Sequence, residues 1–158
     1  MDDKIKSREE LREIAKKLKA SGKIIGFTSG CFDIFHAGHI DYLEKAKEKC
    51  DFLIVGVNSD NSVKKYKGSE RPIIPEKQRL KVVAGIESVD YAFIFDERRN
   101  KENIEILKPD IYFKASDYNK GDLTSSVYLE QLGGKVIIIP IEEDISTSKI
   151  INKIKNVE

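Results

Sequence analysis

The chain has 158 residues, 40% of them hydrophobic and 35% charged, which is typical of one soluble globular domain with its own core. Lys plus Arg (28) nearly balance Asp plus Glu (27), whereas nucleic-acid binders usually carry a basic excess. No apolar run approaches the roughly 20 residues that span a bilayer, and the N-terminus lacks a secretory pattern. We therefore expect a single domain over residues 1–158, with neither a nucleic acid nor a membrane as partner.

The two cysteines, Cys31 and Cys50, are too few for a disulfide framework or a Cys-rich zinc site. Free cysteines are typical of a reducing compartment, so we expect a cytoplasmic protein. As a side chain, Cys31 is more simply explained as a small residue that fills a loop than as a nucleophile.

Residues 1–22 predict an N-terminal helical extension. Ser7 followed by Glu10 is the pattern of a capping box, in which the side chain of each residue binds the backbone N–H of the other. Apolar residues then recur at helical spacing. The helix should run from Ser7 to Ala20 and end at the Ser-Gly pair of residues 21–22.

The rest of the chain alternates between apolar runs and amphipathic segments. We expect strands over residues 23–27, 52–57, 91–95, 111–113 and 136–139. We expect helices over residues 40–50, 63–66, 75–84, 104–107 and 123–132, and a last helix capped by Ser146 or Thr147. Residues 64–75 are polar and basic and should form a mobile loop. This alternation predicts the α/β class, with a parallel sheet of about five strands flanked by helices.

One stretch, Thr28 to His39, contains both histidines of the chain. It links an apolar strand to an amphipathic helix through a loop that contains glycine. A helix N-terminus presents free N–H groups and a positive dipole end, which attract phosphate. His36 and His39 are three residues apart in the first turn and would face the same anion. A zinc pair is the rival interpretation, but no third ligand lies nearby in sequence and zinc sites need three or four.

Polar segments follow several of the expected strands. They cover residues 28–39, 58–75 and 114–118, and a further segment, 142–148, links the last strand to the last helix. In parallel α/β sheets, ligands bind outside the carboxyl ends of the strands. We therefore expect these segments to converge on one nucleotide-binding rim.

Three blocks of sequence in this order carry a resemblance to a known family. They are Gly30-Cys31-Phe32-Asp33-Ile34-Phe35-His36-Ala37-Gly38-His39, then Arg71-Pro72-Ile73-Ile74-Pro75 with Arg79, then Ile145-Ser146-Thr147-Ser148. From residue 23 to the C-terminus the chain resembles the nucleotidylyltransferase superfamily marked by a His-x-Gly-His motif. The resemblance implies a Rossmann-like fold. It also implies a reaction in which a substrate phosphate attacks the α-phosphorus of a nucleoside triphosphate in line and pyrophosphate leaves.

The resemblance also implies roles for particular residues. His36, His39 and Lys65 would be catalytic. Nucleotide or phosphate contacts would come from Cys31, Phe32, Gly38, Lys67, Arg79, Asp117, Ser146, Thr147 and Ser148. Mg²⁺ would accompany ATP. From the residues alone, Arg79 could equally be a surface residue, Asp117 a cap, and the lysines of the 64–67 run part of a solvated loop. Asp33 is better explained as a structural residue that binds loop amides.

Within the superfamily the chain is most similar to bacterial heptose 1-phosphate adenylyltransferases. These are short relatives of the adenylyltransferase half of a bifunctional heptose kinase/adenylyltransferase. The supporting segments are residues 57–64, 84–90 and 113–118. The chain departs from that group at Ala115, Ser116 and Asp144, where glycine is usual. Ile141 stands where glycerol-phosphate cytidylyltransferases typically have Arg, which argues against that subgroup.

The activity that this resemblance implies is transfer of AMP from ATP to a heptose 1-phosphate, giving ADP-heptose and pyrophosphate. Two alternatives stay open at this point. One is a cytidylyl- or adenylyltransferase for another small phosphate ester, such as glycerol 3-phosphate or FMN. The other is a nucleotide-binding protein without turnover. Family likeness also suggests a homodimer.

Overall fold

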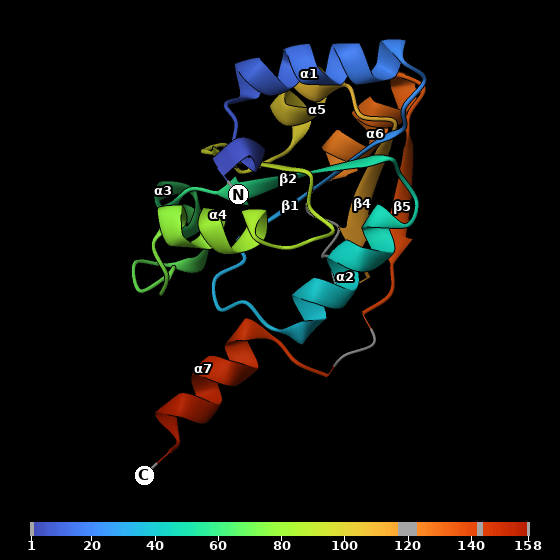
Figure 1. Cartoon of the computed structure of the whole chain (residues 1–158). Helices are drawn as coiled ribbons and strands as arrows, with labels where there is room; N and C mark the ends of the chain where they lie inside the picture. The colour runs from blue at the N-terminus through green and yellow to red at the C-terminus, as the bar shows by residue number, and fades with distance from the viewer. Residues whose placement is uncertain (1, 117–122, 142–143, 158) are drawn as a thin grey trace.

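The computed structural model describes residues 2–116, 123–141 and 144–157. Its centre is a five-stranded, all-parallel sheet in the order β3-β2-β1-β4-β5 (Figure 1). The strands are β1 (Ile25–Gly30), β2 (Phe52–Asn58), β3 (Tyr91–Phe95), β4 (Ile111–Ala115) and β5 (Lys135–Ile139). The predicted α/β class and the predicted number of strands are confirmed.

Helices cover both faces of the sheet. They are α1 (Arg8–Ala20), α2 (Ala37–Lys47), α3 (Asp60–Lys67), α4 (Glu76–Ala84), α5 (Lys101–Leu107), α6 (Leu123–Gln131) and α7 (Thr147–Lys155), after a 3-10 turn at Asp2–Lys4. Helices α1, α5 and α6 lie together on one face, and α2 and α4 on the other (Figure 1). The predicted capping box of α1 is present: Glu10 N–H donates to Ser7 Oγ (3.1 Å) and Ser7 N–H to Glu10 Oε2 (2.7 Å).

Alternation along the strands divides the core between the two faces. On β2, Leu53, Val55 and Val57 pack on the α2 and α4 side, while Ile54 packs on the α1 and α5 side. All four are fully buried, as expected for a central parallel strand. Gly26 on β1 allows close packing, because a Cβ there would lie 2.6 Å from the Phe113 ring.

The structure differs from the sequence-based expectation at helix α3, and it adds two details, on β5 and α7, that the sequence did not predict. Helix α3 extends to Lys67, so the basic loop begins only at Gly68, whose φ is +99°. The highly apolar β5 lies at the sheet edge, and its Ile138 is 56% exposed. Helix α7 projects from the body of the molecule (Figure 1), and none of its residues is buried.

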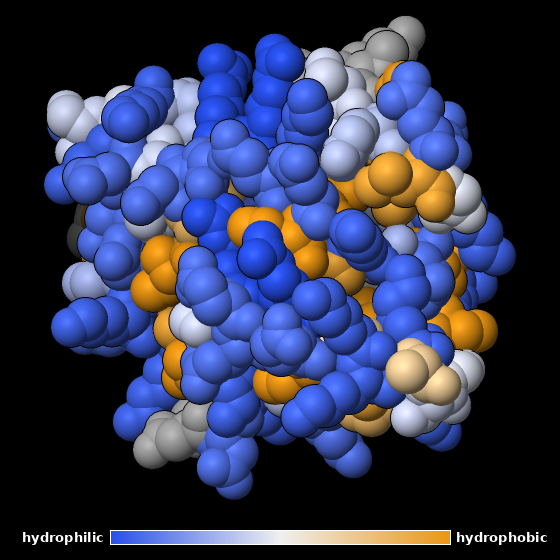
Figure 2. Space-filling model, turned by 90° about the horizontal axis from the view of Figure 1, so that it is seen from above, coloured by the Kyte–Doolittle hydropathy of each residue, from blue (hydrophilic) through white to orange (hydrophobic). Residues whose placement is uncertain are grey.

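The surface over α1 is mostly hydrophilic, with small separate apolar areas (Figure 2). This agrees with the composition of α1, which buries Leu11 and Ala15 and turns its charged side chains outward. Among residues 2–116, 123–141 and 144–157, no helix is both long and apolar enough to cross a membrane.

Candidate active site

A cavity of about 530 Å³ opens at the carboxyl ends of β1 and β4. The strand order reverses between these two strands, and such a switch point is the usual ligand position in open α/β sheets. The predicted convergence of polar segments occurs here. Of the predicted site residues, those that line the cavity are Cys31, Phe32, His36, Gly38, His39, Lys67, Ser146, Thr147 and Ser148.

The histidine loop, residues 31–39, joins β1 to α2. Phe32 adopts a positive φ of 51°, which reverses the chain just past the strand, and its side chain is buried. His36 is the N-cap of α2 and its backbone N–H donates to Nδ1 of His39 (3.2 Å). Since Nδ1 of His39 accepts this bond, the ring proton of neutral His39 sits on Nε2. The two imidazole rings stack with centroids 3.9 Å apart.

Both imidazoles favour the neutral form in this environment. Burial is the main cause that lowers the pKa of His39 to about 4, and nearby positive charge from His36 and Lys67 adds to it. The ring of Phe35 stacks on the imidazole of His39 with centroids 4.9 Å apart, and this contact contributes to the burial of His39. Burial likewise lowers the pKa of His36. The loop therefore offers N–H donors without a permanent charge, and a bound polyanion would favour their protonation.

Asp33 ties the histidine loop to the segment between α3 and α4. Its carboxylate accepts bonds from Arg71 Nε (2.8 Å), from Ile73 N–H (3.0 Å) and from Ile74 N–H (2.8 Å). Burial alone would raise the pKa of this carboxyl, but the two amides and the guanidinium outweigh it and hold the pKa below its ordinary value. Asp33 is thus a structural residue, and it brings the cation Arg71 to the cavity wall.

Arg79 is placed differently from the expectation that it would contact an anion. Its side chain is fully buried and does not line the cavity. It donates to the carbonyls of Cys31 (2.6 Å), Asn58 (2.8 Å) and Ile74 (2.8 Å), and to the carboxylate of Asp60 (2.8 Å). Arg79 lies on the buried face of α4 with Leu80 and Val83, so it holds the ends of β1 and β2 together from behind the cavity.

Lys65 also lies elsewhere than expected. The extension of α3 to Lys67 turns Lys65 toward solvent, and it does not line the cavity. Lys67, at the last position of α3, does line it, and its charge is near enough to lower the pKa of His39. Of the two lysines, Lys67, predicted as a phosphate contact, lies at the cavity, and the catalytic role predicted for Lys65 stays a prediction.

The start of α7 completes the end of the cavity next to the histidine loop. Ser146 caps the helix through the bond from Lys149 N–H to its Oγ (3.1 Å). Thr147 Oγ1 donates to the carbonyl of Ile34 in the histidine loop (3.3 Å). This contact joins two segments more than 100 residues apart in sequence and aims a helix N-terminus at the cavity.

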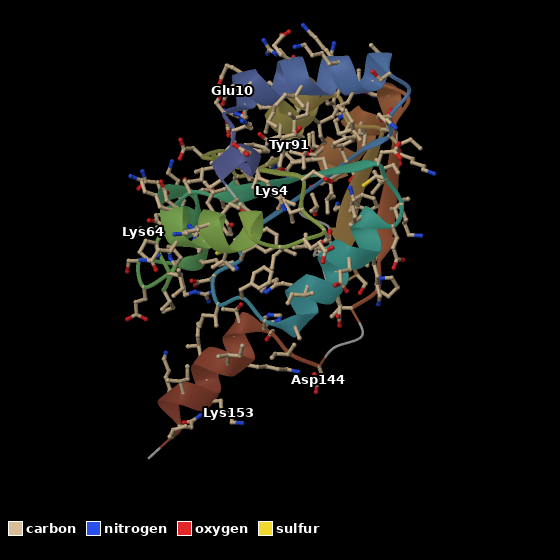
Figure 3. All side chains as sticks on the ribbon, viewed as in Figure 1. Lys4, Glu10, Lys64, Tyr91, Asp144 and Lys153 are labelled. Atoms are coloured by element: carbon tan, nitrogen blue, oxygen red, sulfur yellow. The ribbon has the colours of Figure 1, made fainter. Side chains whose placement is uncertain are left out.

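The departures at Ala115, Ser116 and Asp144 leave this architecture intact. Ala115 is the last residue of β4, and neither it nor Ser116 has a positive φ, so no glycine is required there. Ser116 Oγ accepts from Ile141 N–H (3.0 Å). Asp144 points outward on the segment that leads into α7 (Figure 3), pairs with Lys149 and does not line the cavity. Asp117 lies outside the described residues.

Other residues that line the cavity were missed from the sequence. They include Tyr42, Tyr66, Arg98, Arg99, Asn100 and Lys114. Arg98 to Asn100 follow β3, and the rule that polar segments after strands form the rim would have found them. Lys114 begins the polar segment 114–118 that was expected at the rim, but it was not singled out as a site residue; its buried Nζ donates to Ser126 Oγ (3.2 Å).

The described lining residues contain one carboxylate, that of Asp33, and both its oxygens already accept hydrogen bonds. Across the part of the chain that the structure describes, no group of three or more His, Cys, Asp or Glu residues could hold a metal ion. This donor set suits a cation that arrives bound to a ligand's own phosphates rather than one held by the protein.

Neutral N–H donors and cations at the switch point of a parallel sheet suit the binding of a nucleotide's phosphates, which is the task of a nucleotidyltransferase. Comparison with known proteins agrees with this class. The family described as cytidylyltransferase-like matches residues 27–153. The chain therefore belongs to the cytidylyltransferase-like family.

Curated relatives include the bifunctional protein HldE of several bacteria. The chain is 50% identical over 155 residues to that of Campylobacter jejuni subsp. doylei, covering 98% of this chain and 32% of the relative. It is 40% identical over 153 residues to that of Syntrophotalea carbinolica, covering 97% and 31%. The chain thus spans about a third of the length of these relatives.

Solved structures give the same fold. A lipopolysaccharide core biosynthesis protein from Thermoplasma volcanium is 30% identical with a TM-score of 0.65, covering 78% of this chain and 100% of that one. A pantoate-beta-alanine ligase from Francisella tularensis has a TM-score of 0.59 at 18% identity, covering 97% and 78%. The second likeness concerns the fold alone.

Proposed function

We propose that this nucleotidyltransferase transfers AMP from ATP to a heptose 1-phosphate, giving ADP-heptose and pyrophosphate. An oxygen of the sugar phosphate forms a bond to the α-phosphorus of ATP, and the bond between the α-phosphorus and the bridging oxygen of the β-phosphate breaks. The supporting observation is the meeting of the His36–His39 pair, Lys67 and the α7 start at one cavity. The heptose acceptor rests on the sequence resemblance and on the similarity to HldE relatives.

In this proposal the protein contributes charge and geometry rather than a nucleophile. Nε2–H of His39 donates to a phosphate oxygen, and the amides of the loop and of the α7 start bind neighbouring oxygens. Lys67 and Arg71 neutralise charge that accumulates on the leaving pyrophosphate. His39 packs against the rings of Phe32 and Phe35, which partly shield its hydrogen bonds from bulk water and strengthen them.

Mg²⁺ would enter with ATP, bound by the oxygens of the triphosphate. When bound it would neutralise part of the charge of the leaving pyrophosphate. A homodimer also remains a proposal, which sedimentation equilibrium of the full chain would test.

The proposal is tested by pyrophosphate release from full-length protein given each nucleoside triphosphate, Mg²⁺ and a panel of sugar phosphates. We expect release with ATP and heptose 1-phosphate. Release with CTP and not ATP would indicate a cytidylyltransferase instead. Release with glycerol 3-phosphate or FMN and not with a sugar phosphate would indicate a nucleotidyltransferase for another small phosphate ester. ATP binding without release with any acceptor would indicate a nucleotide-binding protein.

Two lysines of the same helix provide a matched comparison. Lys67 lines the cavity, whereas Lys64 lies on the outer side of the molecule beside α4 (Figure 3). We expect Lys67→Gln to raise KM for ATP about tenfold, since loss of one charge contact of about 1.4 kcal/mol changes affinity by that factor. Lys64→Gln should leave KM unchanged. Equal effects of the two substitutions would mean that the cavity is not the triphosphate site.

A further inference from the structure

The segment between β3 and α5, residues 96–100, forms a wall of the cavity that is separate from the histidine loop. After β3 it crosses the carboxyl ends of the strands, because Asn100 reaches both β1 and β4. Arg98 and Arg99 on this segment line the cavity with exposed side chains. Within the described residues, the hydrogen bonds of Arg99 and Asn100 go to Ser29 and to residues of β4, α5 and α6, and none reaches residues 31–39.

Asn100 fixes this segment to the sheet. It is 2% exposed, and its Nδ2 donates to Ser29 Oγ (2.7 Å) and to Tyr112 Oη (2.9 Å). Its backbone N–H donates to Ser125 Oγ (3.2 Å). A buried and well-satisfied polar network of this kind holds one conformation. The backbone that carries Arg98 and Arg99 is therefore fixed at the cavity wall, although their guanidinium groups reach solvent.

The N-terminal helix braces the same segment from the other side. Arg8 on α1 donates to Glu97 Oε1 (2.8 Å) and to Asn103 Oδ1 (3.0 Å). Asn103 in turn donates to the side-chain oxygen of Asn100 (3.0 Å). Thus the residues on either side of the two arginines are both held in place. Arg8 of α1 binds Glu97 directly, and it supports Asn100 through Asn103.

The cavity is strongly cationic although the chain is nearly neutral overall. Among its described lining residues, the cations are Lys67, Arg71, Arg98, Arg99 and Lys114, against the single carboxylate of Asp33. Arg71 is held at the histidine loop by Asp33, while Arg98 and Arg99 belong to the other wall. The proposed reaction brings two anions, a triphosphate and a sugar phosphate, close together against their mutual repulsion. Two sets of cations at separate walls of one cavity would each neutralise one of these anions.

We propose that Arg98 and Arg99 bind the phosphate monoester of the acceptor and thereby determine which acceptors are used. The inference rests on the proposed function and names the residues for its second substrate. The triphosphate already has cations, imidazoles and a helix N-terminus at the histidine-loop end. The guanidinium groups of the other wall match a dianionic phosphate in geometry and charge.

The test is a comparison of KM values for R98Q/R99Q, R98K/R99K and wild type, with R12Q on the exposed face of α1 as control. We expect R98Q/R99Q to raise KM for heptose 1-phosphate about tenfold or more while KM for ATP changes by less than about twofold. The lysine variant should recover part of the loss, and R12Q should match wild type. A rise in KM for ATP equal to that for the acceptor, or no change in either, would overturn the inference.

A binding measurement separates this inference from the proposed function. If wild type releases no pyrophosphate with any heptose phosphate, inorganic phosphate is titrated by calorimetry into protein saturated with α,β-methylene-ATP. Weakening of phosphate affinity by about tenfold in R98Q/R99Q, with unchanged affinity for the ATP analogue, supports an anion site at these arginines. Undiminished phosphate binding in the variant, or no phosphate binding to wild type, refutes it.

Discussion

Lowering the pH from 7 to 5 should destabilise the unliganded protein through His39. The folded-state pKa of His39 is about 4, whereas an unfolded histidine has a pKa of 6.5. Below pH 6.5 the unfolded chain therefore binds a proton that the folded protein excludes, and stability falls until the pH reaches about 4. For these two values, linkage gives a loss of about 2 kcal/mol between pH 7 and pH 5.

Urea denaturation of wild type and His39→Gln at several pH values between 7 and 5 measures this effect. Glutamine does not titrate, so the substitution should remove about 2 kcal/mol of the pH-dependent loss, whatever constant offset it adds. The lowered pKa of His36 gives a further loss with the same sign, and this remains in the variant. Parallel curves of stability against pH for the two proteins would show that His39 is not buried as a neutral ring.

Three further substitutions test contacts that hold the site. Asp33→Asn should cost about 2 kcal/mol in urea denaturation, because Arg71 and two amides lose an anionic acceptor; a loss below about 0.5 kcal/mol would contradict the clamp. Arg79→Lys should lower the free energy of unfolding by about 3 kcal/mol, since one ammonium cannot satisfy three carbonyls and a carboxylate. Unchanged stability would show that Arg79 does not hold the ends of β1 and β2 together. Gly26→Ala should cost about 1–3 kcal/mol, because its Cβ would lie 2.6 Å from the Phe113 ring; a neutral effect would place the ring elsewhere.

The sequence predicted the order of the elements well, because hydrophobic period and capping residues are local signals. Ser7 and Glu10 set the start of α1, and the apolar run of β2 is buried on both faces as expected. Boundaries were less accurate. The strand expected over residues 23–27 is Ile25–Gly30, because pairing with β2 continues through Gly30 into polar residues that carry no apolar signal.

The roles of single charged residues were harder to predict. Lys64, Lys65 and Lys67 are alike in sequence, and only the end of α3 decides which of them faces the cavity. Arg79 could not be recognised as a buried residue, because its partners include Cys31, Asn58 and Asp60, which belong to two segments distant in sequence. The wall with Arg98 and Arg99 was missed because the rule on polar segments after strands was not applied to the segment after β3, although its anchoring through Asn100 to β1 and β4 is visible only in the structure.

By itself the sequence determined the α/β alternation, and it predicted the histidine loop as a candidate phosphate site, because strand, loop and helix N-terminus are contiguous there. The tertiary structure decided the rest. The sheet order β3-β2-β1-β4-β5 sets the switch point. The histidine loop turns at Phe32 and packs the imidazole of His39 against Phe35, and burial there lowers the pKa of His39 and favours its neutral form. Burial and charge balance depend on contacts between segments far apart in the chain, and no local pattern encodes those.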